Sequence, residues 1–499
     1  MRALLIAVAL LALAAPAGAQ TTVGEVAFAN SGSAAAQAPF LRGLALLHNF
    51  EYADAAAAFR EAQAADPGFA MAYWGEAMTY NHPVWMEQDA EAARAVLARL
   101  GGTPEARAAR AATPRERAWL DAVETLYGEG AKEDRDRLYS AKMAALHAAA
   151  PSDVDARAFY ALSLLGLAHR GRDIALYMRA AALLEEAYPE NRRHPGILHY
   201  LIHSYDDPAH APLGLRAARL YGAVAPEAGH ALHMTSHIFL AMGMWEDVER
   251  VNLQAIATVN RQRAAAGKPA IHCGHYPEWL VYARLQRGEA AQAEADIAAC
   301  RVDAVRELAS APAGKRIEPV RSSVRSWSDM ALRHLVETGR WTGAGGLDLP
   351  EGRYLATRFT LAYADLLLAG PDLERVRVAR GRLTTAALAL SMARQAEGGD
   401  NVAAVRRETI LLRHATALET LASGDAEGGL GELRATAEAE AAMPVEFGPP
   451  LIEKPSRELL ADTLLRLGRG EEARQAYEAA LAAAPGRRLA ERGLAAARR

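Results

Sequence analysis

The chain has 499 residues, 51% of them hydrophobic and 23% charged, with a formal net charge of −4 at pH 7 and a pI near 6.5. Binding to nucleic acid phosphates needs a concentrated basic face, and the sequence has no such stripe, which argues against nucleic acid as a partner. Without the predicted N-terminal signal peptide described below, roughly 480 residues remain. This length is more than one ordinary globular core accommodates, so several domains or a repeat array is expected.

The first 19 residues have the features of a secretory signal peptide. Arg2 supplies a positive charge, Ala3 to Ala15 form an apolar stretch, and Ala17-Gly18-Ala19 is a cleavage motif of small residues. The apolar stretch is too short to cross a bilayer and no second long apolar run follows, so we expect no membrane span. No Cys stands at the cleavage point to accept a lipid. We therefore expect a periplasmic or secreted protein, and the Ala- and Arg-rich composition is typical of bacteria.

The rest of the chain predicts helical hairpins that share a pattern of small, aromatic and proline residues. The same spacing of small, aromatic and proline residues occurs twice, at Ala55, Phe59, Ala62 and Pro67 and again at Ala473, Tyr477, Ala480 and Pro485. Gly43 and Tyr52 precede the first set, and Gly468 precedes the second. Further turns are marked by Gly243-Met244-Trp245, by Gly288 with Ala293, and by Gly339-Arg340-Trp341. The pattern resembles the tetratricopeptide repeat, a pair of antiparallel helices. The resemblance implies an all-α fold, a right-handed α-solenoid of antiparallel helix pairs forming a superhelix.

Four stretches interrupt the helical spacing, at residues 100–114, 301–321, 342–352 and 443–455. The last contains Gly448-Pro449-Pro450 and cannot be regular helix, because proline lacks the backbone donor and clashes with the preceding turn. It could fold over the concave side of the solenoid or be a plain connector. We expect an N-terminal solenoid over residues 36–300, a linker over 301–324 and a C-terminal solenoid over 325–499.

Two His-x-x-x-His pairs lie 34 residues apart, which is the period of the tetratricopeptide repeat. The pairs are His199/His203 and His233/His237. Residues four apart lie on the same face of a helix, so each pair presents two imidazoles side by side. Equivalent positions of successive repeats point to the same surface of a solenoid. The spacing therefore predicts that the four imidazoles converge.

The resemblance also predicts where these side chains point. In the tetratricopeptide family, certain positions of the first helix line a concave groove that binds the ligand, and both pairs fall on such positions. The same positions carry His230, His275 and Glu278. Neutral imidazole binds zinc, copper, iron and nickel, and a carboxylate can complete the site. We therefore expect His199, His203, His230, His233, His237, His275 and Glu278 to hold a divalent transition metal, zinc or copper foremost.

Residues near the cluster have expected supporting roles. Asp206 and Asp207 follow the first pair by a turn, and Tyr282 shares the groove with Glu278, so these three are expected to support the ligands. Glu278 is also the candidate general base on a metal-bound water. Two alternative interpretations of the histidines remain open. One is a metal-free polar groove that binds an anionic or peptide ligand, and the other is structural hydrogen bonding.

The sequence has two cysteines, Cys273 and Cys300, which flank one predicted hairpin. An isolated pair in an oxidising compartment is often a disulfide, and we expect these two to be joined. The alternative is that Cys273, within His272-Cys273-Gly274-His275, is a soft metal ligand.

Two functions remain open from the sequence. The first is a metal-binding solenoid, which as an enzyme would be a metal-dependent hydrolase or oxidoreductase. The second is a metal-free periplasmic scaffold that binds a peptide, a protein or a small molecule in the concave groove. No His-Glu-x-x-His, Cys-x-x-Cys, P-loop or Gly-x-Ser-x-Gly motif occurs, so no standard mechanism can be assigned.

Overall fold

A computed structural model describes residues 22–310, 314–343, 346–397 and 402–499, and the predicted signal peptide lies outside them. Within these ranges the chain forms 23 α-helices, one short 3₁₀ helix and two strands of two residues each. The fold is all-α, as predicted. No helix in this part of the chain is long and apolar enough to cross a membrane.

The first half of the chain contains the helices up to α12. They are α1 (Ala34–His48), α2 (Tyr52–Ala65), α3 (Ala70–Met78), α4 (Ala90–Leu100), α5 (Pro104–Ala108), α6 (Pro114–Leu126), α7 (Lys132–Ala149), α8 (Val154–Leu165), α9 (Ile174–Ala187), α10 (Pro195–Tyr205), α11 (Ala211–Val224) and α12 (Gly229–Ala241). The strands β1 (Asn81–His82) and β2 (Glu87–Gln88) pair antiparallel around the 3₁₀ helix η1 (Pro83–Trp85).

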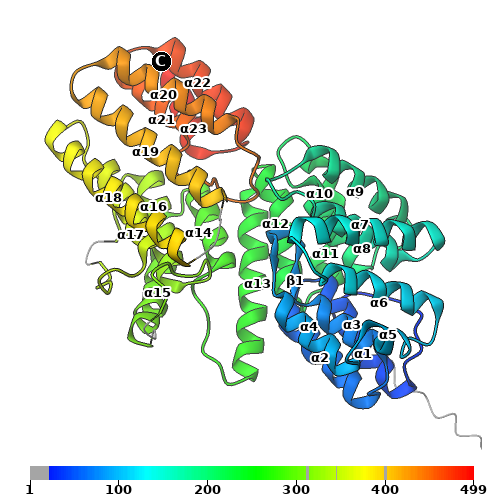
Figure 1. Ribbon diagram of the computed structural model, residues 1–499. Helices are drawn as coiled ribbons and strands as arrows, with labels where there is room; N and C mark the ends of the chain where they lie inside the picture. The colour runs from blue at the N-terminus through cyan, green and yellow to red at the C-terminus, as the bar shows by residue number, and fades with distance from the viewer. Residues whose placement is uncertain (1–21, 311–313, 344–345, 398–401) are drawn as a thin grey trace, which may run out of the picture.

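The second half continues the same order of helices. They are α13 (Trp245–Ala265), α14 (His275–Arg287), α15 (Ala290–Ser310), α16 (Ser323–Thr338), α17 (Leu355–Leu368), α18 (Leu373–Glu397), α19 (Val402–Ala422), α20 (Ala426–Ala441), α21 (Ser456–Arg466), α22 (Gly470–Ala483) and α23 (Arg488–Ala497). Most helices pack on the next helix in the chain, as in a tetratricopeptide-like superhelix. Figure 1 shows the two halves on either side of α13.

Small residues let the helices of a pair approach each other around large ones. Phe59 of α2 is fully buried between α1 and α3. A Cβ added at Gly43 would lie 2.9 Å from the Phe59 ring, and one added at Gly75 would lie 2.3 Å from it. The glycines therefore provide the space for the aromatic ring, which explains the recurrent small and aromatic positions of the repeat pattern.

Glycines also end the hairpin helices as the sequence pattern predicts. Gly243, Gly288 and Gly339 have φ values of +68°, +84° and +71°, in the left-handed region that favours glycine. Each follows the last turn of a helix, α12, α14 or α16, and reverses the chain toward the next segment.

Two interruptions differ from the sequence expectation. Residues 301–310, expected in the linker, continue α15 to Ser310, because Ile297, Cys300 and Ala304 keep a buried stripe at helical spacing. Pro104–Ala108, inside the expected break at 100–114, forms the short helix α5. The segment between α20 and α21 is a loop, as the Gly-Pro-Pro run predicts.

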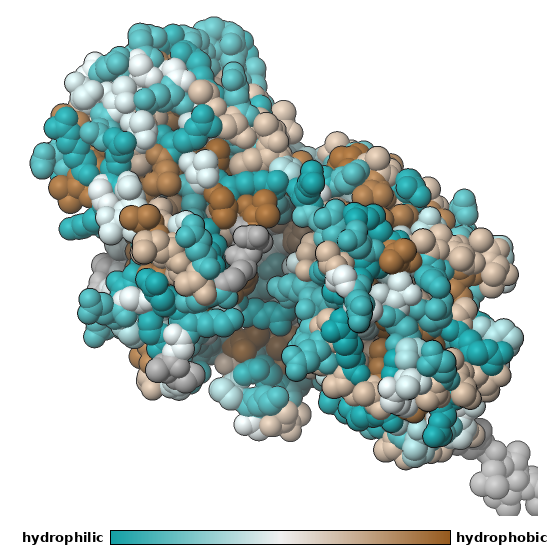
Figure 2. Space-filling view, viewed as in Figure 1, coloured by the Kyte–Doolittle hydropathy of each residue, from teal (hydrophilic) through white to brown (hydrophobic). Residues whose placement is uncertain are grey.

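The C-terminal end folds back onto the middle of the chain. The indole Nε1 of Trp245 in α13 donates to the carbonyl oxygen of Gly486 at 2.8 Å, and Arg487 donates to the Tyr282 hydroxyl at 3.0 Å. Between the halves lies a cleft of about 820 Å³, whose lining includes Trp85, Arg172 and Phe447. Figure 2 shows the hollow between the two halves on the surface of the molecule.

Candidate metal centre

The two histidine pairs lie on neighbouring helices and converge, as the 34-residue spacing predicts. His199 and His203 are on α10, and His233 and His237 are on α12, each at most 2% exposed. The ring centroids of His203 and His237 are 5.8 Å apart. This spacing is similar to the 4.8 Å between His199 and His203 within one pair. The four imidazoles therefore form one cluster.

Three of the histidines form a first group, the inner triad, which consists of His199, His203 and His230. One nitrogen from each lies within 4.8 Å of the others. His199 Nδ1 donates to the carbonyl oxygen of His48 at 2.7 Å, so the neutral ring leaves a lone pair on Nε2. The Nε2 atoms of all three rings are buried and have no hydrogen-bond partner among the described residues.

The outer triad consists of His233, His237 and His275, again with nitrogens within 4.8 Å of one another. It adjoins the inner triad, because the His230 and His233 rings are 6.1 Å apart. His275 begins α14 and is exposed, whereas the other two are buried. The outer triad therefore has one side that solvent can reach.

Hydrogen bonds fix the protonation of two outer-triad rings. His237 Nδ1 lies 2.5 Å from Asp206 Oδ2, and His233 Nδ1 lies 2.7 Å from Asn252 Oδ1. The Asn252 amide cannot be reversed without loss, because its Nδ2 donates to the Val248 carbonyl at 2.8 Å. Both Nδ1 atoms must therefore carry the proton of a neutral ring.

The two Nε2 atoms of His233 and His237 consequently face each other with lone pairs. They are 3.2 Å apart. Two lone pairs at hydrogen-bond distance repel each other unless a proton or a cation lies between them. A proton on the Nε2 of His237 would make that ring a cation paired with the Asp206 carboxylate, and it would donate to the His233 Nε2. A metal ion coordinated by both nitrogens removes the repulsion.

Burial keeps the rings neutral and ready to coordinate. It lowers the pKa of His199 to about 3. It also lowers the pKa values of His203, His230 and His233 well below the ordinary value, and neighbouring imidazoles add to each shift. Metal binding requires the neutral imidazole, so at neutral pH no proton has to be displaced from these nitrogens.

The turn between α1 and α2 packs against the inner triad and forms hydrogen bonds with it. The His48 carbonyl accepts the hydrogen bond of His199, and Glu51 Oε1 accepts the backbone N–H of His230 at 2.8 Å. Phe50 has a φ of +58°, unusual for a residue other than glycine, and its ring centroid lies 4.3 Å from that of His199. No local pattern indicates the role of this turn, since His48 and Glu51 lie 151 and 179 residues before His199 and His230.

A third group, His48, Asp155 and His194, also brings potential ligand atoms within 4.8 Å. Its nitrogens are already engaged. His48 Nδ1 is 2.9 Å from the Tyr200 hydroxyl, and its Nε2 is 2.9 Å from Asp155 Oδ1, which also lies 3.3 Å from His194 Nε2. Burial opposes ionisation of Asp155, but the hydrogen bonds to His194 and His48 lower its pKa overall. This group is a hydrogen-bonded network that fixes His48 and its carbonyl.

The other predicted site residues lie as follows. Asp206 bonds to His237, as described above. Asp207 lies 2.8 Å from His210 Nδ1 and accepts from Arg172 at 2.9 Å. The structure thus brings the six predicted histidines together and places Asp206 behind them.

Glu278 belongs to neither triad. Burial raises the pKa of its carboxyl group to about 7, the charge of Asp329 raises it further, and Ser326 opposes the shift through a hydrogen bond. Ser326 and Asp329 are residues of α16, so Glu278 faces that helix. The Tyr282 hydroxyl accepts from Arg487 at 3.0 Å.

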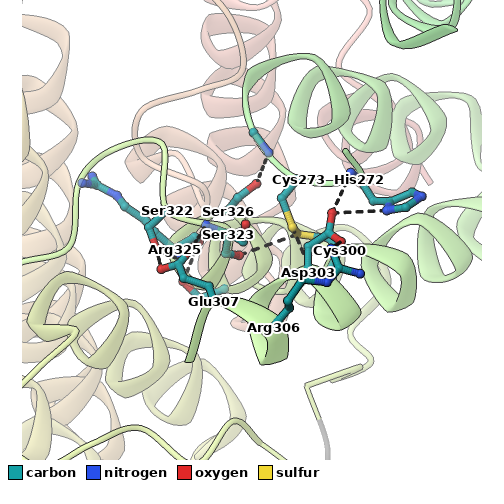
Figure 3. Close-up of a disulfide and its surroundings, with 12 residues drawn as sticks. His272, Cys273, Cys300, Asp303, Arg306, Glu307, Ser322, Ser323, Arg325 and Ser326 are labelled. Carbon is teal, nitrogen blue, oxygen red and sulfur yellow. Dashed lines mark hydrogen bonds and ion pairs between the residues drawn. A yellow bond between two sulfur atoms is a disulfide. The ribbon is translucent and has the colours of Figure 1, made fainter. Parts of the chain in front are cut away.

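A disulfide joins Cys273 to Cys300, with a Cα–Cα distance of 4.8 Å. It links the segment before α14 to α15, and Figure 3 shows it beside His272 and Asp303. The backbone N–H of His272 donates to Asp303 Oδ2 at 2.9 Å. The bridge removes Cys273 from the possible thiolate ligands, and it holds the chain two residues before His275.

Aromatic rings surround the imidazoles. Trp279 packs on His237 with centroids 4.4 Å apart, and Phe447 lies 5.2 Å from His237 and 6.2 Å from His203. Trp85 lies 5.8 Å from His230. Trp85 and Phe447 also line the cleft between the halves, so these two rings lie between the cleft and the cluster.

Comparisons with known proteins inform the fold alone. No family model matches the chain, and no curated protein matches it. Among solved structures, the APC/C hetero-tetramer Cut9–Hcn1 is 11% identical, with a TM-score of 0.38, covering 94% of this chain and 78% of that one. Naa15/Naa10 bound to HypK-THB is 12% identical, with a TM-score of 0.25 and coverages of 88% and 67%. The P58(IPK) TPR domain is 11% identical, with a TM-score of 0.21 and coverages of 93% and 97%. With similarities this low, it is the sequential helix pairs of the chain itself that give it a tetratricopeptide-like fold.

Proposed function

We propose that this chain binds two transition metal ions, one in each histidine triad. The observation that carries the proposal is the 3.2 Å distance between the Nε2 atoms of His233 and His237. The Nδ1 atoms of both rings already take part in hydrogen bonds, to Asp206 and to Asn252. The three unpartnered Nε2 atoms of the inner triad support a second ion. Buried polar atoms are normally hydrogen-bonded, so the three unpartnered Nε2 atoms and the two that face each other need an explanation.

The ligand set favours zinc or copper. Imidazole nitrogen is a ligand for both, whereas magnesium and calcium prefer oxygen. Three protein ligands leave a further coordination position, as in catalytic zinc sites, while structural zinc sites are closed by four. We therefore infer centres that can take an exogenous ligand, which is compatible with a hydrolase or an oxidoreductase. Glu278 faces α16 rather than the triads, so its assignment as a ligand or general base is not part of this proposal.

The cleft is the proposed place for the partner of the metal centre. Its volume of about 820 Å³ can accommodate a small molecule or a peptide segment, and its lining includes Trp85 and Phe447, whose rings pack against triad histidines. The predicted leader and the Cys273–Cys300 disulfide support an exported protein, because disulfides persist in oxidising compartments.

Metal analysis of the purified protein tests the proposal. The full chain, stripped with a chelator and reloaded with zinc or copper, should retain two ions after removal of excess metal. His203→Ala should lose the inner ion and His237→Ala the outer one, with circular dichroism unchanged. His147→Ala, which removes a histidine outside both triads, should keep two. A wild-type chain that retains no metal would instead support the scaffold function with a metal-free groove.

A further inference from the structure

The two triads consist of uncharged ligands only. Each is made of three imidazoles, with no carboxylate and no thiolate among the grouped atoms of the described residues. The outer nitrogens of the ligands are bonded to one carboxylate, Asp206, while His233 and His199 face the neutral Asn252 and a backbone carbonyl. Two divalent ions would therefore bring four positive charges beside two carboxyl groups, Asp206 at the outer triad and Glu51 at the inner one.

Burial makes this charge imbalance important. Five of the six ligands are at most 7% exposed, and Phe50, Trp279 and Phe447 pack against them. Charge in such surroundings is costly unless it is compensated. Monovalent ions halve the charge, and copper is the transition metal that proteins hold in a monovalent state. Copper also stands highest in the affinity order of divalent ions for nitrogen sites.

The triads are close enough to act on one small molecule. The closest ring pairs between the triads, His203 with His237 and His230 with His233, have centroids 5.8 and 6.1 Å apart. Centroid distances within the outer triad range from 4.4 to 6.4 Å. Neighbouring rings are thus no further apart between triads than within one. A molecule between the ions can therefore be a ligand of both.

We propose that the triads hold a pair of cuprous ions that bind one dioxygen molecule between them and transfer two electrons to it. This inference rests on the proposed function. Each copper is oxidised from the cuprous to the cupric state and gives up one electron. Dioxygen is reduced to peroxide, its double bond becomes a single bond, and the dianion stays bound to both ions without a proton. The dianion compensates the charge that the neutral ligands leave uncompensated, and the apolar rings around the site suit uncharged dioxygen as the entering molecule.

Loading the full chain with cuprous ion under anaerobic conditions, followed by addition of dioxygen, tests this inference. We expect one dioxygen consumed for two coppers, a new charge-transfer absorption, and almost no cupric signal in electron paramagnetic resonance, because the two unpaired electrons couple through the bridge. His237→Ala should retain one copper and show a full cupric signal after oxidation. His147→Ala should behave as the wild type.

Each other outcome has a distinct meaning. Two retained coppers that oxidise independently, with full cupric signals in the wild type, overturn the shared dioxygen site but leave the proposed function intact. Retention of two zinc ions against an equal concentration of cuprous ion overturns the choice of copper alone. Failure to retain any metal contradicts the proposed function as well.

Discussion

Two fully buried histidine sites in this chain differ in one respect, the state of the second ring nitrogen. His414 in the C-terminal half is completely buried, like His199 in the inner triad. Its Nδ1 lies 2.9 Å from the Tyr363 hydroxyl, and its Nε2 lies 2.7 Å from Ser456 Oγ. His199 has only one nitrogen engaged. Burial is therefore not the mark of a metal ligand in this fold. The inner triad is set apart because three unpartnered buried nitrogens lie within 4.8 Å of one another.

The comparison predicts that only the triads respond to metal. When the concentration of free metal is a thousandfold above the dissociation constant, each ion should raise the free energy of unfolding by about 4 kcal/mol, because the ion binds the folded state alone. Chemical denaturation with and without metal measures the gain. The double variant His203→Ala with His237→Ala should show none of it, whereas His414→Ala should show all of it. A gain that survives in the double variant would place the metal elsewhere.

His414→Ala should destabilise the chain without affecting metal stoichiometry. The substitution removes a buried ring and leaves the Tyr363 and Ser456 hydroxyls without their partner, which costs about 2 to 3 kcal/mol. Chemical denaturation of the metal-free protein measures the loss. If His414→Ala were neutral for stability and lowered the metal content, the contrast between the two sites would be wrong.

Asp206→Asn should weaken the outer ion while leaving the inner one in place. The carboxylate holds the His237 ring and makes it a stronger ligand, and loss of such a partner typically lowers metal affinity about 10- to 100-fold. Competition with a chelator of known affinity measures the change. Asp303→Asn, which alters a carboxylate bonded to His272 outside the triads, is the matched control and should leave both affinities unchanged.

The pH dependence of stability should also distinguish His414. Burial lowers its pKa to about 3, and the charge of Lys454 adds to the shift. Between the unfolded pKa of about 6.5 and the folded one, the unfolded chain binds a proton that the folded chain does not, so stability falls as the pH falls, by about 1.4 kcal/mol per pH unit. In the metal-free protein, His414→Ala should remove this contribution to the pH dependence of the free energy of unfolding. An unchanged slope would mean that His414 is protonated in the folded state.

The sequence was sufficient to predict the helical repeats and the meeting of the two histidine pairs. Both follow from local spacing, since i and i+4 share a helix face and one repeat period brings α10 and α12 into register. His230 and His275 were also predicted from the repeat phase. They complete the two triads.

The prediction was less successful where geometry depends on tertiary detail. Glu278 was expected beside His275, with the same three-residue spacing as His230 and His233 in α12. It faces α16 instead, next to Ser326 and Asp329, because α16 packs on α14. The roles of His48, Glu51 and Phe50 had no local signal, because the curvature of the whole first half brings the α1–α2 turn to the inner triad.

That turn changes how the repeat array behaves as a unit. In an open solenoid each repeat contacts only its neighbours, so a terminal repeat can be removed or exchanged at the cost of one interface. Here His48 and Glu51 bond to residues that follow them by 151 and 179 positions. The first helix pair is therefore not a dispensable cap, because its loss would uncover the inner triad and leave His199 and the backbone of His230 without acceptors. Because these contacts join the first helix pair to α10 and α12, we expect the first half to unfold more cooperatively than an open repeat array does.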